Sequence, residues 1–473
     1  MAERDTKACM EDAASISDLV LIAERNLEVA RRLDIIPLRR GSLTSLAAGS
    51  VYWPTSSGAH IPSDIELRVI HEASSRHDGH RQTLETLGVQ EAPVHEVRSL
   101  ILQKHATLGE LTLTACKEHL HFLYLTHEYR RFDNELRLVC IIDQKLRLKR
   151  PRKEVVYLPG RTEFSPEQLL SQVEATDSGT LACSASFLNG ALLEDPPSVT
   201  MVAHLGVATY PTWKRWLRDC LGVHEQLQLA NPTGDDLSNE FAQISWSKPD
   251  IVLGLLANIW RSQHTAVSQK PELMRKIRNI QVPSGTSDLR PLWETYMPFK
   301  HLQRRCLEFM KPNEPFPFVD FGTEPSTDDL TRKWAFLYQD LGVSKNDDLG
   351  LLLDILSYIQ EANPDGLSSH RCRDLARLYC EMEAACAASE EPESARDICR
   401  SFIQDIKGVA IPPIPGHGPR WVSLAQCSWD GPTSTTSKVS WRHVYEETLG
   451  CSPRELAILS KFFSHLCSLK SVE

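Results

Sequence analysis

The sequence lacks any Cys-x-x-Cys pair, although it contains 13 cysteines among its 473 residues. A disulfide framework normally uses an even number of cysteines crowded into a small domain. An odd number of scattered cysteines argues against such a framework. The pattern instead indicates reduced, mostly buried thiols in an intracellular protein.

Long apolar runs, secretion signals and glycosylation acceptors are also missing. The longest apolar runs, Ile251–Trp260 and Leu349–Ile359, are too short to span a bilayer. No apolar signal core follows the charged start Met1–Asp5. The one Asn-x-Thr sequence, Asn231-Pro232-Thr233, is blocked by its proline. We therefore expect a soluble protein of the cytoplasm or nucleus that makes no membrane contact.

Positive charge is scarce overall, because the formal net charge is -10 and the sequence pI is about 6.0. A duplex-binding protein needs a basic face to displace counterions, so that class is disfavoured. The exception is Lys145–Lys153, where basic residues first alternate with leucine. Alternation at period two favours a half-buried hairpin strand with an exposed basic face. Weak nucleic-acid binding through Lys145–Lys153, or recognition by nuclear import machinery, is the alternative.

Motifs that would hold nucleotides or supply paired carboxylates are incomplete. No glycine-rich phosphate loop occurs. Asp320-Phe321-Gly322 copies the metal-binding tripeptide of protein kinases, but the other kinase motifs are missing, so we expect a turn after a strand at Phe316–Val319. Asp177-Ser178-Gly179-Thr180 copies half of an aspartic protease site without a second half, which favours a polar loop.

Soft metal ligands are clustered but lack the partner pair that a zinc site normally recruits from another segment. The densest cluster comprises Cys116, His119, His121 and His127. A second group, His71, His77 and His80, lies in a polar, loop-like stretch. We predict no metal, no cofactor and no small-molecule ligand at either group.

One cysteine has a histidine close by in sequence. Cys220 and His224 flank a Leu-Gly-Val sequence, so contact between them is feasible. A catalytic cysteine also needs a lowered pKa and an oriented base, and no third group is evident. A thiol enzyme at Cys220 and His224 is therefore the alternative, and a Cys220 packed into a helix end is favoured.

The strongest positive feature is a unit that occurs four times in the same order. Each copy has strand-like segments that end in an aromatic-Pro or Trp-Asp stop, followed by a helical stretch that closes on Leu-Gly-(Val/Cys). The stops are Val51-Tyr52-Trp53-Pro54, Val156-Tyr157-Leu158-Pro159, Thr295-Tyr296-Met297-Pro298 and Cys427-Ser428-Trp429-Asp430. The closers are Leu87-Gly88-Val89, Leu221-Gly222-Val223, Leu341-Gly342-Val343 and Leu449-Gly450-Cys451. A chain of repeated modules is more often a binding platform than a lone catalyst.

The closers predict a specific backbone geometry. A helix often ends with a left-handed glycine at C′, followed by an apolar residue that packs back on the last turn. The segment Ile35–Trp53, which runs into the first stop, predicts a hairpin that turns at Arg39–Ser42. The separation of stop and closer differs between copies, which excludes a solenoid of fixed period.

The predicted fold is a helix-rich α/β (α+β) chain of serial modules, each a small β-hairpin or sheet followed by helices. The predicted divisions are a disordered leader at 1–17 and modules at 18–130, 131–275, 276–400 and 401–473. The third module includes a mobile acidic linker at 383–395, and 231–240 is a further predicted linker.

The order of these segments resembles the region downstream of the ATPase domain in large fungal proteins related to sacsin and the plant protein NO VEIN. The resembling segments are 37–42 with 51–54, 61–62 with 87–89, 210–213 with 216–217 and 221–223, 291–292 with 295–298, 334–343, and 421–423 with 427–432. That family carries a histidine-kinase-like (Bergerat-type) ATPase, whose motifs are not found here. The resemblance implies a chaperone-associated or assembly role for the parent protein, and no nucleotide-binding residue carries over.

Together these features predict a non-catalytic intracellular scaffold that binds other proteins, with no catalytic, cofactor or metal residues of its own.

Overall fold

The computed structural model describes residues 27–75, 78–107, 111–128, 134–174, 185–196, 212–286, 288–312, 314–413, 418–429 and 439–467. The chain groups into two compact units. Unit 1 comprises Met1–Thr233 with Ser238–Phe241, and unit 2 comprises Gly234–Leu237 with Ala242–Glu473. The predicted leader at 1–17 and the Asp177–Thr180 motif lie outside the described residues. The four-module division stays a prediction.

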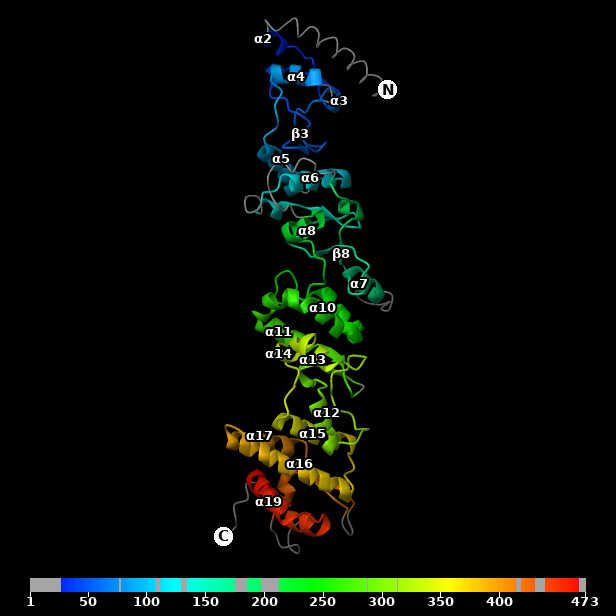
Figure 1. Ribbon diagram of the computed structural model, residues 1–473, viewed down its shortest axis with the longest axis vertical. Coiled ribbons are helices and arrows are strands. Elements are labelled where there is room, and N and C mark those ends of the chain that lie inside the picture. The colour runs from blue at the N-terminus through cyan, green and yellow to red at the C-terminus, as the bar shows by residue number, and fades with distance from the viewer. Residues whose placement is uncertain are drawn as a thin grey trace. The chain divides into compact units, whose positions relative to one another are not determined.

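Both units have the helix-rich α+β organisation that the sequence predicts, with short two-stranded pairings between helices (Figure 1). Unit 1 contains, in chain order, α2 (Leu27–Ala30), β1 (Ile36–Pro37), β2 (Leu43–Thr44), η1 (Leu46–Ala48), β3 (Thr55–Ser56), β4 (Ala59–His60), α3 (Glu72–Ser75), α4 (Asp78–Leu87), α5 (Val94–Ala106), α6 (Leu113–Leu125), η2 (Glu135–Leu138), β5 (Ile141–Ile142), β6 (Leu148–Lys149), β7 (Val156–Tyr157), α7 (Pro166–Glu174), β8 (Ser186–Phe187), η3 (Gly190–Leu193), α8 (Trp213–Trp216) and η5 (Leu217–Leu221).

Helix α9 (Asn239–Ser247) begins where the chain passes from unit 1 to unit 2, next to the linker predicted at 231–240. Unit 2 continues with α10 (Pro249–Ser268), α11 (Pro271–Arg278), β9 (Gln281–Pro283), β10 (Leu289–Pro291), η6 (Leu292–Glu294), α12 (Lys300–Phe309), α13 (Thr327–Arg332), α14 (Ala335–Gln339), α15 (Leu349–Ala362), α16 (Ser369–Ala388), α17 (Pro392–Asp405), β11 (Val409–Ile411), β12 (Arg420–Val422), η7 (Leu424–Gln426), β13 (Cys427–Ser428), β14 (Val439–Ser440), α18 (Trp441–His443), η8 (Val444–Thr448) and α19 (Pro453–Cys467). In the described part of the chain, no helix combines the length and apolar content that crossing a bilayer requires.

The four predicted closing glycines share one backbone setting. Gly88, Gly222, Gly342 and Gly450 have φ values of 112, 83, 86 and 62°. The next residue donates its backbone N–H back into the helix, from Val89 to Leu84 (2.9 Å), Val223 to Leu217 (3.1 Å), Val343 to Leu337 (3.0 Å) and Cys451 to Tyr445 (2.9 Å). These apolar residues are all buried. The prediction of a left-handed C′ glycine followed by a packed apolar residue is therefore confirmed in all four copies.

In three of the four closers the last helical turn contains one residue more than a standard helix end. In the second, third and fourth copies the returning hydrogen bond spans one residue more than in the first. Two of these ends, η5 and η8, are π-helical. Such a widening adds a residue to the last turn, and the spacing of apolar residues does not reveal it.

The stop segments and closers are joined by parallel pairing in the first three copies. The bridges are Tyr52 with Gln90, Tyr157 with His224, and Tyr296 with Ser344. The same two hydrogen bonds recur in each copy. In the first bond, the N–H of the residue after the tyrosine (Trp53, Leu158 or Met297) donates to the carbonyl of the closing residue (Gln90, His224 or Ser344). In the second, the N–H of that closing residue donates to the carbonyl of the residue before the tyrosine (Val51, Val156 or Thr295). On its other side each tyrosine pairs in parallel with a middle segment, at Val69, Phe187 or Phe318. In the fourth copy the stop strand β13 pairs in parallel with β14.

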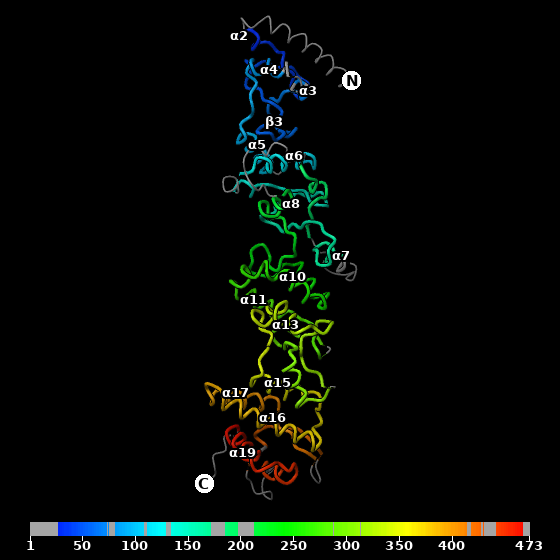
Figure 2. Tube along the Cα trace, viewed as in Figure 1, coloured from blue at the N-terminus to red at the C-terminus, as the bar shows by residue number. Residues whose placement is uncertain are grey.

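A β-hairpin precedes each stop. The hairpins pair β1 with β2, β5 with β6, β9 with β10, and β11 with β12, all antiparallel. The first is shorter than predicted, because Ser50–Trp53 leaves the hairpin and forms the parallel stop strand instead. The chain can be followed through the hairpins in Figure 2.

The predicted acidic linker at 383–395 is wrong. Its first residues belong to α16 and its last residues begin α17. Glu383 is 3% exposed and accepts hydrogen bonds from Arg396 at 2.9 Å, while Lys461 of α19 lies 3.1 Å away. These helices pack on α15 in the core of unit 2, where Figure 1 shows α16 and α19 side by side. Acidic and alanine residues are good helix formers, so their composition fits a buried helix as well as a linker.

Candidate functional site

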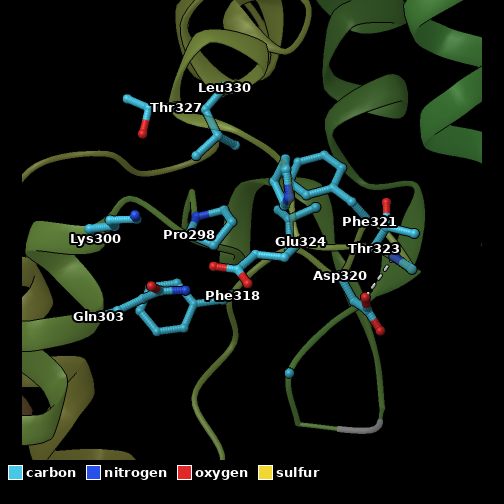
Figure 3. A pocket seen from close by; sticks show the side chains of 14 residues that line it. Pro298, Lys300, Gln303, Phe318, Asp320, Phe321, Thr323, Glu324, Thr327 and Leu330 are labelled. Atoms are coloured by element: carbon cyan, nitrogen blue, oxygen red, sulfur yellow. Dashed lines mark hydrogen bonds between the residues drawn. The ribbon is translucent and has the colours of Figure 1, made fainter.

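A candidate site in unit 2 lies at the carboxyl ends of two parallel strands of the third copy. The stop strand ends at Pro298, and the middle segment ends at Val319 and leads into Asp320. A cavity of about 300 Å³ opens there, lined by residues of α12, of the loop 318–325 and of α13 (Figure 3). In open sheets, ligands bind in the crevice outside the carboxyl ends of parallel strands. We call this cavity the module-3 pocket.

The loop of the module-3 pocket is held in place by its own side chains. The Asp320 carboxylate accepts a hydrogen bond from the Gly322 N–H at 2.8 Å, and Gly322 has φ of 73°. The Phe321 ring packs on Trp334 with centroids 4.5 Å apart. Asp320-Phe321-Gly322 therefore forms the predicted turn.

The pocket presents apolar walls beneath charged side chains. Pro298, Phe318 and Leu330 contribute apolar surface, and Leu330 is buried. Figure 3 shows the Glu324 side chain reaching between Pro298 and Phe318 toward Gln303. The lining includes two carboxylates and one lysine but no cysteine, histidine or tyrosine. Such a lining can hold a peptide side chain, but it offers no nucleophile next to an imidazole base.

A second cavity, of about 390 Å³, lies in the first copy and is likewise lined by the stop proline. It begins at Pro54, which follows the stop strand as Pro298 does in the third copy. His60 Nε2 lies 3.0 Å from the Glu72 carboxylate, and the Arg81 guanidinium lies 5.4 Å from the centre of the Trp53 ring. We call this cavity the module-1 pocket.

The predicted soft-ligand cluster is dispersed over separate contacts. The Cys116 thiol faces the Cys140 carbonyl at 3.8 Å, and the His121 ring packs against Trp213 at 5.3 Å. His127 lies near Cys220, whereas His119 contacts Asp64. Across the described residues, no three His, Cys, Asp or Glu side chains converge as a metal ion would require. Of the second group, His71 forms a backbone bond to Pro37, His77 is outside the described residues, and the His80 side chain is not described.

His119 belongs to a buried relay whose tautomers are fixed by its ends. The Cys140 N–H donates to His105 Nδ1 at 3.0 Å, so Nε2 of neutral His105 carries the proton and donates to His119 Nδ1 at 3.2 Å. His119 Nε2 then donates to the Asp64 carboxylate at 2.8 Å. Burial lowers the pKa of His105 to about 3 and also lowers the pKa of His119. The relay therefore links α5 and α6 as a neutral structural contact.

The structure places His127, rather than His224, beside the Cys220 thiol. The His127 Nε2 atom lies 3.7 Å from Cys220 Sγ, and Cys220 is 5% exposed. His224 enters the parallel pairing with Tyr157, on the far side of the Gly222 turn. The alternative reading, a Cys220–His224 pair, does not form, because the left-handed turn directs the chain after Gly222 into the strand. Cys220 packs in the helix end and lines neither pocket.

The basic segment forms a hairpin with an exposed basic face, as predicted. Arg147 pairs with Asp143 at 2.8 Å and Lys149 with Glu154 at 3.4 Å. Arg152 donates to the Cys220 carbonyl at 2.7 Å. Three of the six basic residues in 145–153 thus form contacts within unit 1. The exposed basic surface is therefore smaller than the sequence suggests.

An arginine at the end of every closing helix was not predicted. Arg31, Arg152, Arg278 and Arg373 donate to the carbonyls of Leu87 (2.9 Å), Cys220 (2.7 Å), Asp340 (2.8 Å) and Leu449 (3.3 Å). A cation at this end complements the helix dipole and satisfies an orphan carbonyl. These arginines come from different elements, so no fixed spacing in the sequence reveals them.

Comparison with protein-family models, curated proteins and solved structures gives no match to this chain. The likeness to the sacsin and NO VEIN scaffold region therefore stays a prediction.

Proposed function

We propose that this chain is a non-catalytic scaffold that binds segments of partner proteins in its strand-end pockets. The observation that supports this most strongly is the recurrence of a pocket at one position, directly after the stop proline, in the first and third copies. A repeated fold that repeats its cavity offers several similar binding places along one chain. Association with an ATPase-bearing chaperone, which the family likeness implies, is part of this proposal.

The thiol chemistry supports binding over catalysis. Burial raises the pKa of Cys116, Cys306, Cys372 and Cys380 to about 12 each. Since the thiolate is the reactive form, such thiols are poor nucleophiles near neutral pH. None of the nine cysteines that the described residues characterise forms a disulfide, and eight of these nine are buried. Reduced thiols are typical of the cytoplasm or nucleus, where we place the protein.

The test is a comparison of partners between pocket variants. The tagged protein is purified from its own cells as wild type, Glu72→Lys (module-1 pocket) and Glu324→Lys (module-3 pocket). Glu390→Lys is the control, because Glu390 is exposed and outside both pockets. We expect specific proteins to accompany the wild type and the control and to be reduced about tenfold with one pocket variant, the loss that about 1.4 kcal/mol of binding energy gives. An identical set of proteins with all four chains, or a turnover that requires Cys220, would overturn the proposal.

A further inference from the structure

The tip of the second hairpin carries an apolar residue in a conformation that favours glycine. Leu146 has φ of 58° and is 69% exposed. The first hairpin has the same turn, with a backbone bond from Leu38 to Ser42 at 2.8 Å that matches the bond from Asp143 to Arg147 at 3.0 Å. At the position of Leu146 the first hairpin has Gly41, with φ of 82°.

Leu146 therefore carries two costs within its own unit. A left-handed backbone is unfavourable for a residue with a Cβ atom, and an exposed leucine leaves its apolar surface in water. Strain of this kind is concentrated where it serves function. A contact that buries the leucine side chain would offset both costs.

The hairpin presents Leu146 on a rigid and basic support. Asp143 is 1% exposed and holds Arg147 both through its backbone N–H and through its guanidinium, at 2.8 and 2.9 Å. Residues 145–153 include six Lys or Arg and no acidic residue, and the three that do not serve the fold of unit 1 are Lys145, Arg150 and Lys153. Because the tip is already ordered, little conformational entropy is lost when it binds.

The module-3 pocket has the complementary properties. Its walls include Pro298, Phe318 and Leu330, and Glu324 stands over them (Figure 3). Its lining includes the carboxylates of Asp320 and Glu324 against the single base Lys300. An apolar recess under a predominantly acidic rim matches an apolar tip flanked by basic residues.

We infer that the module-3 pocket of one chain binds the 141–149 hairpin of a second copy, with Leu146 in the recess and Lys145 near Glu324. This inference rests on the proposed binding role of the strand-end pockets. The hairpin and the pocket are different surfaces, so a single contact between two copies leaves one hairpin and one pocket free. These free surfaces either close a ring of copies or bind further copies as concentration rises.

Sedimentation velocity of the purified full chain tests the inference. We expect concentration-dependent association that weakens with added salt, because exposed charges are screened. Leu146→Gly relieves the backbone strain and removes the side chain, so it should keep the fold while weakening association by about tenfold to a hundredfold, as loss of one buried leucine implies. Glu324→Lys should weaken it similarly. Leu289→Gly, which removes another exposed leucine from a hairpin, is the control and should leave association unchanged.

Mixing the two defective chains gives the sharpest result. Leu146→Gly keeps an intact pocket and Glu324→Lys keeps an intact hairpin, so the mixture should form one-to-one dimers that grow no further. Circular dichroism of each variant confirms that it is folded. A chain that stays monomeric at every concentration and salt, or association that neither variant weakens, would overturn the inference. If cellular partners are nevertheless lost with Glu324→Lys, the proposed function stands while this contact is rejected.

Discussion

Gly342 shows how much one residue contributes to the turn that closes each module. Its φ of 86° is strained for any residue with a side chain, while a Cβ atom would meet nothing closer than 3.8 Å. Gly342→Ala therefore isolates the cost of backbone conformation, about 1–2 kcal/mol of the free energy of unfolding. Urea denaturation measures the change. Gly418→Ala is the control, since Gly418 is outside the left-handed region and has open space around it. Equal stability of the two variants would contradict this assignment.

The buried His105 makes unit 1 sensitive to acid. His105 is neutral when folded because burial lowers its pKa to about 3, whereas an unfolded histidine titrates near 6.5. Between these values the unfolded state binds the extra proton, so stability falls as pH falls from about 6.5 toward 3. The groups that face His105 (His119, Asp64 and Arg150) leave this direction unchanged.

His105→Leu should therefore lower stability at pH 7 but flatten its decline at lower pH. The full lowering of the His105 pKa on folding corresponds to roughly 4–5 kcal/mol of the free energy of unfolding. Urea unfolding at a series of pH values between 7 and 4 measures the slope. His95→Leu on the same helix is the control, because His95 is exposed and should leave the slope as in the wild type. A slope for His105→Leu as steep as the wild type would rule out this role.

The sequence reveals residue types better than their partners. The left-handed glycines could be predicted because C′ geometry depends on neighbours within one turn. Asp64 could not be predicted as the partner of His119, because 55 residues separate them. Cys220 and His224 are close in sequence, yet the turn at Gly222 separates their side chains, so nearness along the chain was misleading.

At the scale of single helices, each arginine cap should contribute measurably to the free energy of unfolding. Arg278 donates to the Asp340 carbonyl at the end of a closing helix, whereas Arg275 on the same helix α11 pairs only with exposed Glu272. Arg278→Ala should lower the free energy of unfolding by about 1 kcal/mol, because a cation and a hydrogen bond are lost at a helix C-terminus. Arg275→Ala should change it by less than about 0.5 kcal/mol. Thermal or urea unfolding distinguishes them, and a larger loss with Arg275→Ala would refute the capping role.

The contact between α16, α17 and α19 is a second element-scale test. Removing Glu383 leaves Arg396, whose side chain is 8% exposed, without its buried carboxylate. Glu383→Ala should therefore cost about 3 kcal/mol or more, the usual penalty for breaking a buried pair. Glu393→Ala removes the exposed partner of the same arginine and should cost at most about 1 kcal/mol. If urea unfolding gave equal costs, the segment would behave as the mobile linker that its composition first suggested.

Over the whole molecule, local signals predicted the repeat but not the pockets. Stops and closers are each set by a few adjacent residues, so their order was visible in the sequence. The module-3 pocket needs residues from a strand end, a loop and two helices, and the hairpin that we match to it belongs to unit 1. Only coordinates show which residues line such a pocket or lie at the tip of such a hairpin. The order of strand-like and helical segments nevertheless predicted the class correctly as a helix-rich α+β chain.

Hydrogen exchange at three backbone amides tests the repeated architecture most directly. Gln90, His224 and Ser344 each donate to a stop strand, at 3.2, 2.8 and 2.9 Å. If one unit truly recurs, all three amides should exchange slowly, together with the stop strands themselves, while the exposed loop residues Thr323 and Glu324 exchange rapidly. Exchange at these three amides as fast as in that loop would contradict the shared parallel pairing, and with it the recurrence of the pockets.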